Sequence, residues 1–132
     1  MASRIKAIGA LRPRIQLGKT VQKAELVRSL ARATSLNEGS VDLVIKELRD
    51  QIIEYHRTGR AVKIEGLGTW TPNMALDGAL DVQYRADGAI ISGLNTAGLF
   101  TGDVVNRENI GKSGDELTTL WNEQHPEDPV AD

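Results

Sequence analysis

The stretch between Asn37 and Gly59 constrains the fold most. Its apolar residues recur every three or four positions, which is the period of one face of an α-helix. Asn37 is a favourable N-cap and Gly59 a favourable residue just beyond the last turn, so a helix is predicted between them. Apolar positions between Val21 and Ala31 predict an earlier amphipathic helix, with Thr20 as its N-cap and an end near Ser35. Together the two helices make a helical hairpin.

After Gly59 the apolar period changes to about two, which predicts strands. Residues 61–65 and 69–71 are expected to form two short strands joined by a tight bend at residues 66–68. Asp77-Gly78 predicts a hairpin turn in which both residues have positive φ, and residues 80–84 predict the next strand. Asp87 is expected to cap a short helix that runs to Leu94.

The two ends of the chain give weaker signals. Residues 1–19 suit a disordered arm or an extra strand over residues 14–17. A transit peptide fits less well, because such peptides are rich in serine and residues 1–19 contain only Ser3. Phe100 and residues 104–105 predict a last strand, and Ser113 with Glu116 predicts a capping box. That box opens a final helix with Leu117, Leu120 and Trp121 on its buried face, followed by a mobile tail. The expected organisation is therefore a basic N-terminal arm (1–19), a central domain (20–95) and a C-terminal extension (96–132).

Composition excludes several classes of protein. Apolar residues make up 40% of the chain and charged residues 26%, which is typical of a globular protein in water. The absence of cysteine excludes a disulfide framework, a thiolate nucleophile and a cysteine zinc site. No apolar run approaches the roughly 18 residues of a membrane helix, so no membrane partner and a cytoplasmic location are expected.

Motifs for catalysis are weak. Residues 106–113 resemble a phosphate-binding loop, but Asn106 occupies the position that requires glycine, and Glu108 would place a carboxylate beside the phosphates. His56 and His125 have no neighbouring nucleophile or carboxylate at a suggestive spacing. We therefore expect no enzyme activity, no cofactor, no metal and no small-molecule substrate.

Charge is strongly polarised along the chain. Residues 1–35 contain eight Lys or Arg and a single acid, whereas residues 103–132 contain two basic residues and eight acids, and the net charge is -2. A basic head indicates a partner of negative charge, although the same asymmetry also suits a protein that only needs to stay soluble.

Three motifs follow one another in order between Val21 and Trp70. Val21-Gln22-Lys23-Ala24-Glu25-Leu26-Val27 opens the helical hairpin, and Val62-Lys63-Ile64 and Gly66-Leu67-Gly68-Thr69-Trp70 follow it. With these motifs, the residues from Val21 to Trp70 resemble the HU and integration-host-factor family of bacterial histone-like DNA-binding proteins. The resemblance implies an α+β fold: a helical hairpin followed by a small antiparallel β-sheet with an arm, in an intertwined homodimer. Under the resemblance, the dimer core comprises Val41, Val44, Ile45, Leu48, Ile52 and Trp70.

The resemblance also implies a nucleoid protein that binds double-stranded DNA through its phosphate backbone with low sequence specificity. The family's long basic arm is missing here, because residues 73–84 contain no Lys or Arg, so the arm is expected to be short with an acidic tip. The DNA contacts expected on this chain are therefore Arg4, Lys6, Arg12, Arg14, Lys19, Lys23, Lys63, Gly66, Gly68 and Arg85. The alternative is a dimer of the same fold that serves as a protein interaction or structural module and has lost DNA bending or DNA binding.

Overall fold

A computed structural model describes residues 1–131 of the chain. These residues form two compact units: the central unit contains residues 21–100, and the terminal unit combines residues 1–20 with the residues from 101 onward. The two segments that flank the central unit in sequence therefore pack with each other.

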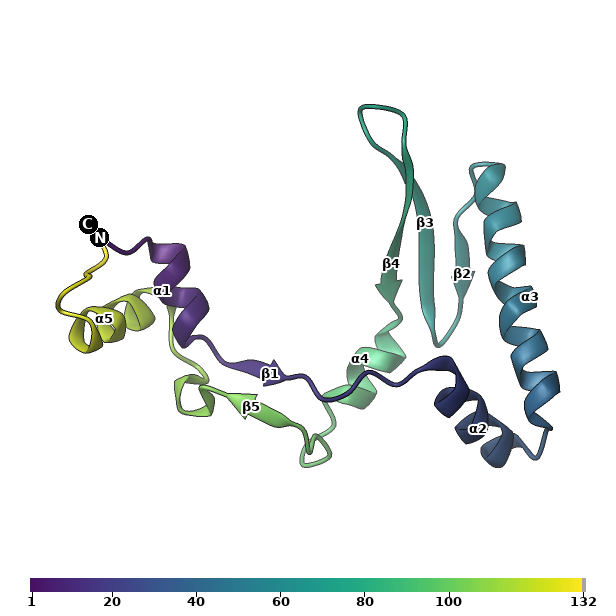
Figure 1. Cartoon of the computed structure of the whole chain (residues 1–132), viewed down its shortest axis with the longest axis horizontal. Helices are drawn as coiled ribbons and strands as arrows, with labels where there is room; N and C mark the ends of the chain where they lie inside the picture. The colour runs from purple at the N-terminus through teal and green to yellow at the C-terminus, as the bar shows by residue number, and fades with distance from the viewer. Residues whose placement is uncertain (132) are drawn as a thin grey trace. The chain divides into compact units, whose positions relative to one another are not determined.

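The central unit begins with the helical hairpin predicted from the sequence (Figure 1). Helix α2 spans Lys23–Thr34 and helix α3 spans Glu38–Arg57. The side chain of Asn37 accepts a hydrogen bond from the backbone N–H of Ser40 at 2.7 Å, as its N-cap role predicts. At the other end, Gly59 has φ of 79°, and the N–H of Arg60 donates to the carbonyl of Tyr55, which closes a Schellman motif.

The start of α2 differs from the prediction. Gln22, and not Thr20, is the N-cap residue, and its side chain makes no capping hydrogen bond. The helix begins two residues later than a cap at Thr20 would place it, and the first N–H groups of α2 receive no hydrogen bond from the side chain of the N-cap residue.

A three-stranded antiparallel sheet follows the hairpin. Strands β2 (Val62–Ile64), β3 (Gly68–Met74) and β4 (Leu80–Ala86) lie in the order β2-β3-β4. Because β2 pairs only with the first residues of β3, the remainder of β3 and β4 extends beyond β2 as a two-stranded arm (Figure 1). The α+β class and the order of helices and strands in this unit are confirmed.

The turn at the end of the arm has the predicted position but a different conformation. Gly78 has φ of 86°, whereas Asp77 does not have positive φ. The N–H of Gly78 donates to the carbonyl of Ala75, and the N–H of Ala75 donates to the carbonyl of Ala79. This is a three-residue loop, in which only the last residue needs the left-handed conformation that glycine adopts easily.

Helix α4 (Gly88–Leu94) completes the central unit. As predicted, Asp87 is its N-cap and accepts a hydrogen bond from the backbone N–H of Ala89 at 2.8 Å.

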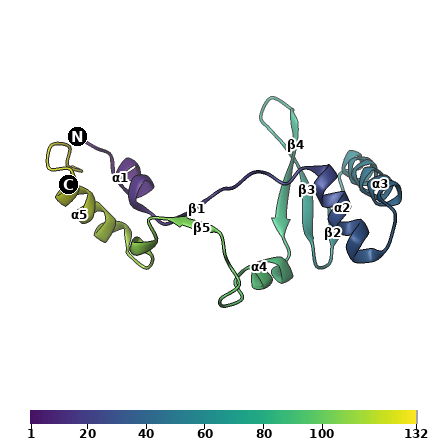
Figure 2. The same cartoon turned by 60° about the horizontal axis from the view of Figure 1, so that its bottom comes forward.

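The terminal unit is built from both ends of the chain (Figure 2). Its elements are α1 (Arg4–Leu11), β1 (Arg14–Gln16), β5 (Asp103–Val105), the 3-10 helix η1 (Arg107–Asn109) and α5 (Gly114–Gln124). Strand β1 pairs with β5 in antiparallel fashion, with Ile15 opposite Val104. The strands expected near residues 14–17 and 104–105 are thus present, but helix α1 was not anticipated.

The terminal unit has a small core. Ala2, Ala7 and Trp121 are buried together, with Leu11 and Val130 packed against them. Ala2 and Val130 also form a parallel β-bridge, so the expectation of a mobile tail is wrong for the described residues after Pro126. A hydrogen bond also connects this segment to α5: the indole N–H of Trp121 donates to the carbonyl of Asp128 at 2.8 Å.

The side chains of two asparagines form hydrogen bonds between the η1 segment and the end of α1. The amide of Asn106 donates to the carbonyls of Ala10 and Arg12, and the buried Asn109 donates to the carbonyl of Leu11 at 2.7 Å. Carbonyls at a helix C-terminus lack helical partners, and these amides satisfy them. The part of residues 106–113 that resembles a phosphate loop therefore has a structural role, and Ser113 caps α5 by accepting from the N–H of Glu116.

Candidate nucleic-acid interface

The sheet of the central unit has one apolar face and one polar face. Side chains alternate between the faces along each strand, and cross-strand partners share a face. Trp70 is paired with both Val62 and Tyr84, and the Trp70 and Tyr84 ring centroids lie 5.0 Å apart on the apolar face. The opposite face carries polar residues: Lys63, Thr69, Thr71, Asn73, Asp81, Gln83 and Arg85.

Two predicted DNA contacts lie on this polar face in one row. Thr69 is the cross-strand partner of Lys63 on one side and of Arg85 on the other. Lys63 and Arg85 are exposed, and all three residues line a hollow of about 640 Å³ at the base of the sheet. The row presents two cations with a hydroxyl between them, which is a suitable combination for contacts to phosphate oxygens.

An acidic side chain lies beside the same hollow. Hydrogen bonds from the backbone N–H groups of Ala89 and Gly66 lower the pKa of Asp87, and Lys63 lowers it further by Coulombic attraction. The N–H of Gly66, which was expected to face a phosphate, thus faces a carboxylate of the chain itself. Asp87 caps helix α4, which follows the sheet. The sequence therefore indicated its capping role but gave no signal for its contact with the N–H of Gly66.

Gly68 is buried and lies in β3 opposite Ala86, the residue that follows Arg85 in the neighbouring strand β4. A Cβ atom at this position would lie 2.5 Å from the carbonyl oxygen of Arg85 and 2.6 Å from Cε1 of Tyr84. The glycine is therefore required for the close approach of β3 and β4.

Several predicted contacts in the N-terminal segment already have acidic partners. The Arg4 guanidinium lies 2.7 Å from the Asp115 carboxylate, and the Lys6 ammonium lies 3.4 Å from that of Asp128. The N-terminal amine lies 3.5 Å from Asp128 as well. Arg12, Arg14 and Lys19 have no acidic partner within 4.0 Å among residues 1–131. The basic head and the acidic end of the chain thus neutralise each other in part.

Lys23 on α2 is also paired. Its ammonium lies 2.9 Å from the carboxylate of Asp42, which also accepts from Lys46 at 2.8 Å. Hydrogen bonds from Lys46 and then Lys23 lower the pKa of Asp42. This three-residue cluster links α2 to α3.

The residues expected in a dimer core divide between two environments. Val41 is buried, and Ile45, Ile52 and Trp70 are half-buried. Val44 and Leu48 are 64% and 38% exposed, and further large apolar side chains of α2 and α3 are exposed with them: Leu26, Leu30, Leu43, Ile53 and Tyr55. Val27 and Val41 are the only large apolar side chains of α2 and α3 that are buried in the isolated chain.

The end of the arm is mainly apolar. Met74 and Leu80 are cross-strand partners that are 71% and 74% exposed, and Leu76 in the turn is fully exposed. Asp77 accepts a hydrogen bond from the N–H of Ala79, so its carboxylate helps to hold the turn. This end combines three large apolar side chains with one acid and carries no cation.

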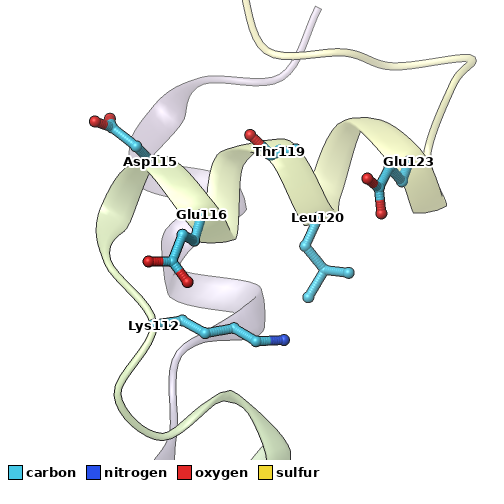
Figure 3. Close-up of a pocket in the computed structure, with 6 residues that line it drawn as sticks. All are labelled: Lys112, Asp115, Glu116, Thr119, Leu120 and Glu123. Atoms are coloured by element: carbon cyan, nitrogen blue, oxygen red, sulfur yellow. The ribbon is translucent and has the colours of Figure 1, made fainter.

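The terminal unit has a shallow hollow of about 360 Å³ along α5 (Figure 3). Glu116, Leu120 and Lys112 lie on one side of the helix in this view, and the Lys112 ammonium donates to the Asn109 amide oxygen at 2.9 Å. Lys112 is thereby held by η1. No cluster of three or more potential metal ligands occurs among residues 1–131, and no helix in that range is long and apolar enough to span a membrane.

Comparison with known proteins identifies the class. A family model described as "HU domain fused to wHTH, Ig, or Glycine-rich motif" matches residues 6–90, which is more than half of the chain. The chain therefore belongs to this family of HU-like proteins. The match extends from α1 into α4, whereas β5, η1 and α5 lie beyond it. A search of curated proteins found no match.

Proposed function

We propose that the protein is a homodimeric, nucleoid-associated protein that binds double-stranded DNA through its phosphate backbone with low sequence specificity. Membership of the HU-like family carries this proposal. Within the proposal, the HU-like domain corresponds to the central unit, and the exposed polar face of its sheet faces the DNA.

The row of Lys63, Thr69 and Arg85 supports this orientation. These residues come from three adjacent strands, so the sheet fixes the backbone positions from which both cationic side chains extend. Phosphate contacts fix the position of a protein on DNA without reading bases, which agrees with the low specificity proposed.

The cations without acidic partners are the best candidates for further phosphate contacts. These are Arg12, Arg14 and Lys19 in the terminal unit. Arg4, Lys6 and Lys23 are weaker candidates, because DNA would have to compete with Asp115, Asp128 and Asp42 for them. Gly66 and Gly68 are proposed to shape the turn at the sheet base instead of donating to phosphate.

Exposed apolar side chains of the helical hairpin support the homodimer. A chain that leaves Val44, Leu48 and Leu26 in water loses much of the hydrophobic stabilisation available to it. Packing the same surface of a second chain against them would bury these side chains in a self-complementary interface.

Two observations favour the alternative function. Acidic residues near the C-terminus pair with Arg4 and Lys6, and residues 73–84 of the arm contain no Lys or Arg. In this alternative, the protein is a structural or interaction module of the same fold that does not bind DNA. The two functions differ in one observable, which is affinity for duplex DNA.

A duplex titration at two salt concentrations separates the two functions. Each neutralised phosphate contributes a slope of about -0.9 to log affinity against log salt concentration. Replacing Lys63 and Arg85 by glutamine in both subunits should therefore flatten the slope by roughly 3 to 4. Lys46→Gln is the matched control, since Lys46 already has Asp42 as a partner. If the intact protein does not bind duplex DNA at about 50 mM salt, the DNA-binding proposal fails and the interaction module is favoured.

The homodimer has its own test. Leu48→Asp should reduce the sedimentation coefficient to that of a monomer or unfold the central unit, because burying an unpaired carboxylate costs several kcal/mol, of the order of 3 or more. Asp50→Asn changes the charge by the same amount at an exposed position of α3 that faces away from Leu48, because residues two apart lie on opposite sides of a helix, and it should leave the assembly intact. If the unaltered protein sediments as a monomer at micromolar concentration, the homodimer is refuted.

A further inference from the structure

The outer edge of β4 is open to pairing. In the order β2-β3-β4, strand β4 has β3 on one side, and no strand pairs with its other side anywhere in residues 1–131. A free edge presents backbone N–H and C=O groups that another strand can use. The edge spans the seven residues Leu80–Ala86, with Gln83 at its centre.

The register of the β3–β4 ladder determines which backbone groups point outward. In antiparallel pairs, successive residues point their backbone groups alternately toward the partner strand and away from it. Val82 is opposite Pro72, which has no N–H, and the N–H of Val82 donates to the side chain of its own neighbour, Asp81, at 2.8 Å. The backbone groups of Val82 therefore point outward, and by alternation those of Tyr84 do too.

The edge is self-complementary when a second copy approaches it in the antiparallel direction. A two-fold axis at Gln83 places Val82 opposite Tyr84 of the second copy, and these two outward-pointing residues can exchange backbone hydrogen bonds. The same register places Asp81 opposite Arg85 of the second copy. It does so twice, because the interface is symmetric.

Charge and face agree with this register. Asp81, Gln83 and Arg85 all lie on the polar face, so each carboxylate meets a guanidinium across the new strand pair. They occupy non-hydrogen-bonded positions, where opposite side chains approach most closely. Val82 and Tyr84, each 48% exposed, bring apolar side chains together on the other face.

We propose that two copies of this chain associate through β4, edge to edge and antiparallel, with Asp81 of each copy paired to Arg85 of the other. This contact is separate from the helical dimer, so it would join dimers to one another through their arms. In the isolated chain, the Asp81 carboxylate accepts the hydrogen bond of the Val82 N–H. When the edges pair, that N–H donates to Tyr84 of the second copy instead, and the Asp81 carboxylate pairs with Arg85 of the second copy. The inference does not depend on DNA binding.

Cysteine cross-linking tests the register directly, because the chain has no cysteine of its own. In the full-length protein, Gln83→Cys places two sulfurs at a non-hydrogen-bonded pair whose Cα atoms are about 4.5 Å apart, within the range for a disulfide. Thr71→Cys is the matched control: Thr71 is exposed and opposite Gln83 on β3, but two copies of it would be three strand spacings, about 14 Å, apart. Mild oxidation without DNA should give a covalent dimer with Gln83→Cys and little with Thr71→Cys.

Charge reversal tests the pairing. In the Gln83→Cys background, Asp81→Arg should lower the yield of covalent dimer about tenfold, as should Arg85→Asp, because each places like charges opposite each other twice. The double variant with both reversals should restore the yield. Equal cross-linking of Gln83→Cys and Thr71→Cys, or no restoration in the double variant, would overturn the proposal. The role of Asp81 would then be to satisfy the N–H of Val82 on an edge that pairs with no other strand. The Leu48→Asp and duplex experiments report on different surfaces, so their failure is distinguishable from this one.

Discussion

Replacement of Gly68 by alanine tests the close contact between β3 and β4. The added Cβ would lie 2.5 Å from a backbone carbonyl and 2.6 Å from the Tyr84 ring, and φ is 155°. The carbonyl cannot move away without separating the two strands. Overpacking of this kind adds about 1–3 kcal/mol to a backbone strain of about 1–3 kcal/mol, so a destabilisation of about 2–6 kcal/mol is expected.

Gly66→Ala isolates the backbone contribution. Gly66 has φ of 88°, but a Cβ atom there would meet nothing within 4 Å. Its loss of stability should be that of a left-handed alanine alone, about 1–2 kcal/mol. Urea unfolding of both variants at one protein concentration measures the difference, since association links stability to concentration. The reasoning is refuted if Gly68→Ala is no less stable than Gly66→Ala.

Three further predictions concern the terminal unit and the sheet base. Deletion of residues 1–19 removes α1 and β1, so Trp121 should become exposed and its fluorescence should shift to longer wavelength in a Trp70→Phe background; an unchanged spectrum would contradict the packing of α1 on α5. Asn109→Leu should destabilise the unit by about 1–3 kcal/mol in thermal unfolding, because the Leu11 carbonyl loses its donor. The pKa of Asp87 in the folded protein lies below the ordinary 3.8, so its carboxylate stabilises the fold above pH 3.8, and this contribution is lost as the pH falls through the lowered pKa. The difference in unfolding free energy between the unaltered protein and Asp87→Asn should therefore decrease over that acidic range. A difference that does not change with pH would refute the role of the charge.

The elements of the central unit could be predicted because their signals are local. The apolar period of α3, the cap at Asn37 and the left-handed Gly59 all lie within one helix and its ends. The alternation in β3 and β4 likewise reflects a sheet with one apolar face. For the turn, the sequence predicted the position but not the type, because a two-residue and a three-residue loop both accept glycine at position 78.

Helix α1 could not be predicted with the same rules. It has eight residues, and a helix this short is marginal in water without tertiary contacts. The only local signal was Ser3, whose side chain accepts from the N–H of Lys6 at 3.1 Å. What stabilises the helix is the burial of Ala7 near Trp121, more than a hundred positions away in the chain.

The charge pattern shows the same division between sequence and structure. The amino-acid sequence is enough to show that residues 1–35 are basic, that residues 103–132 are acidic and that residues 73–84 contain no Lys or Arg. It does not show that Arg4 pairs with Asp115 and Lys6 with Asp128, or that Lys63 and Arg85 lie in one row; these neighbours result from the fold. The physical reason is that periodicity and capping act over a few residues, whereas ion pairs and strand neighbours depend on which distant segments the fold brings together.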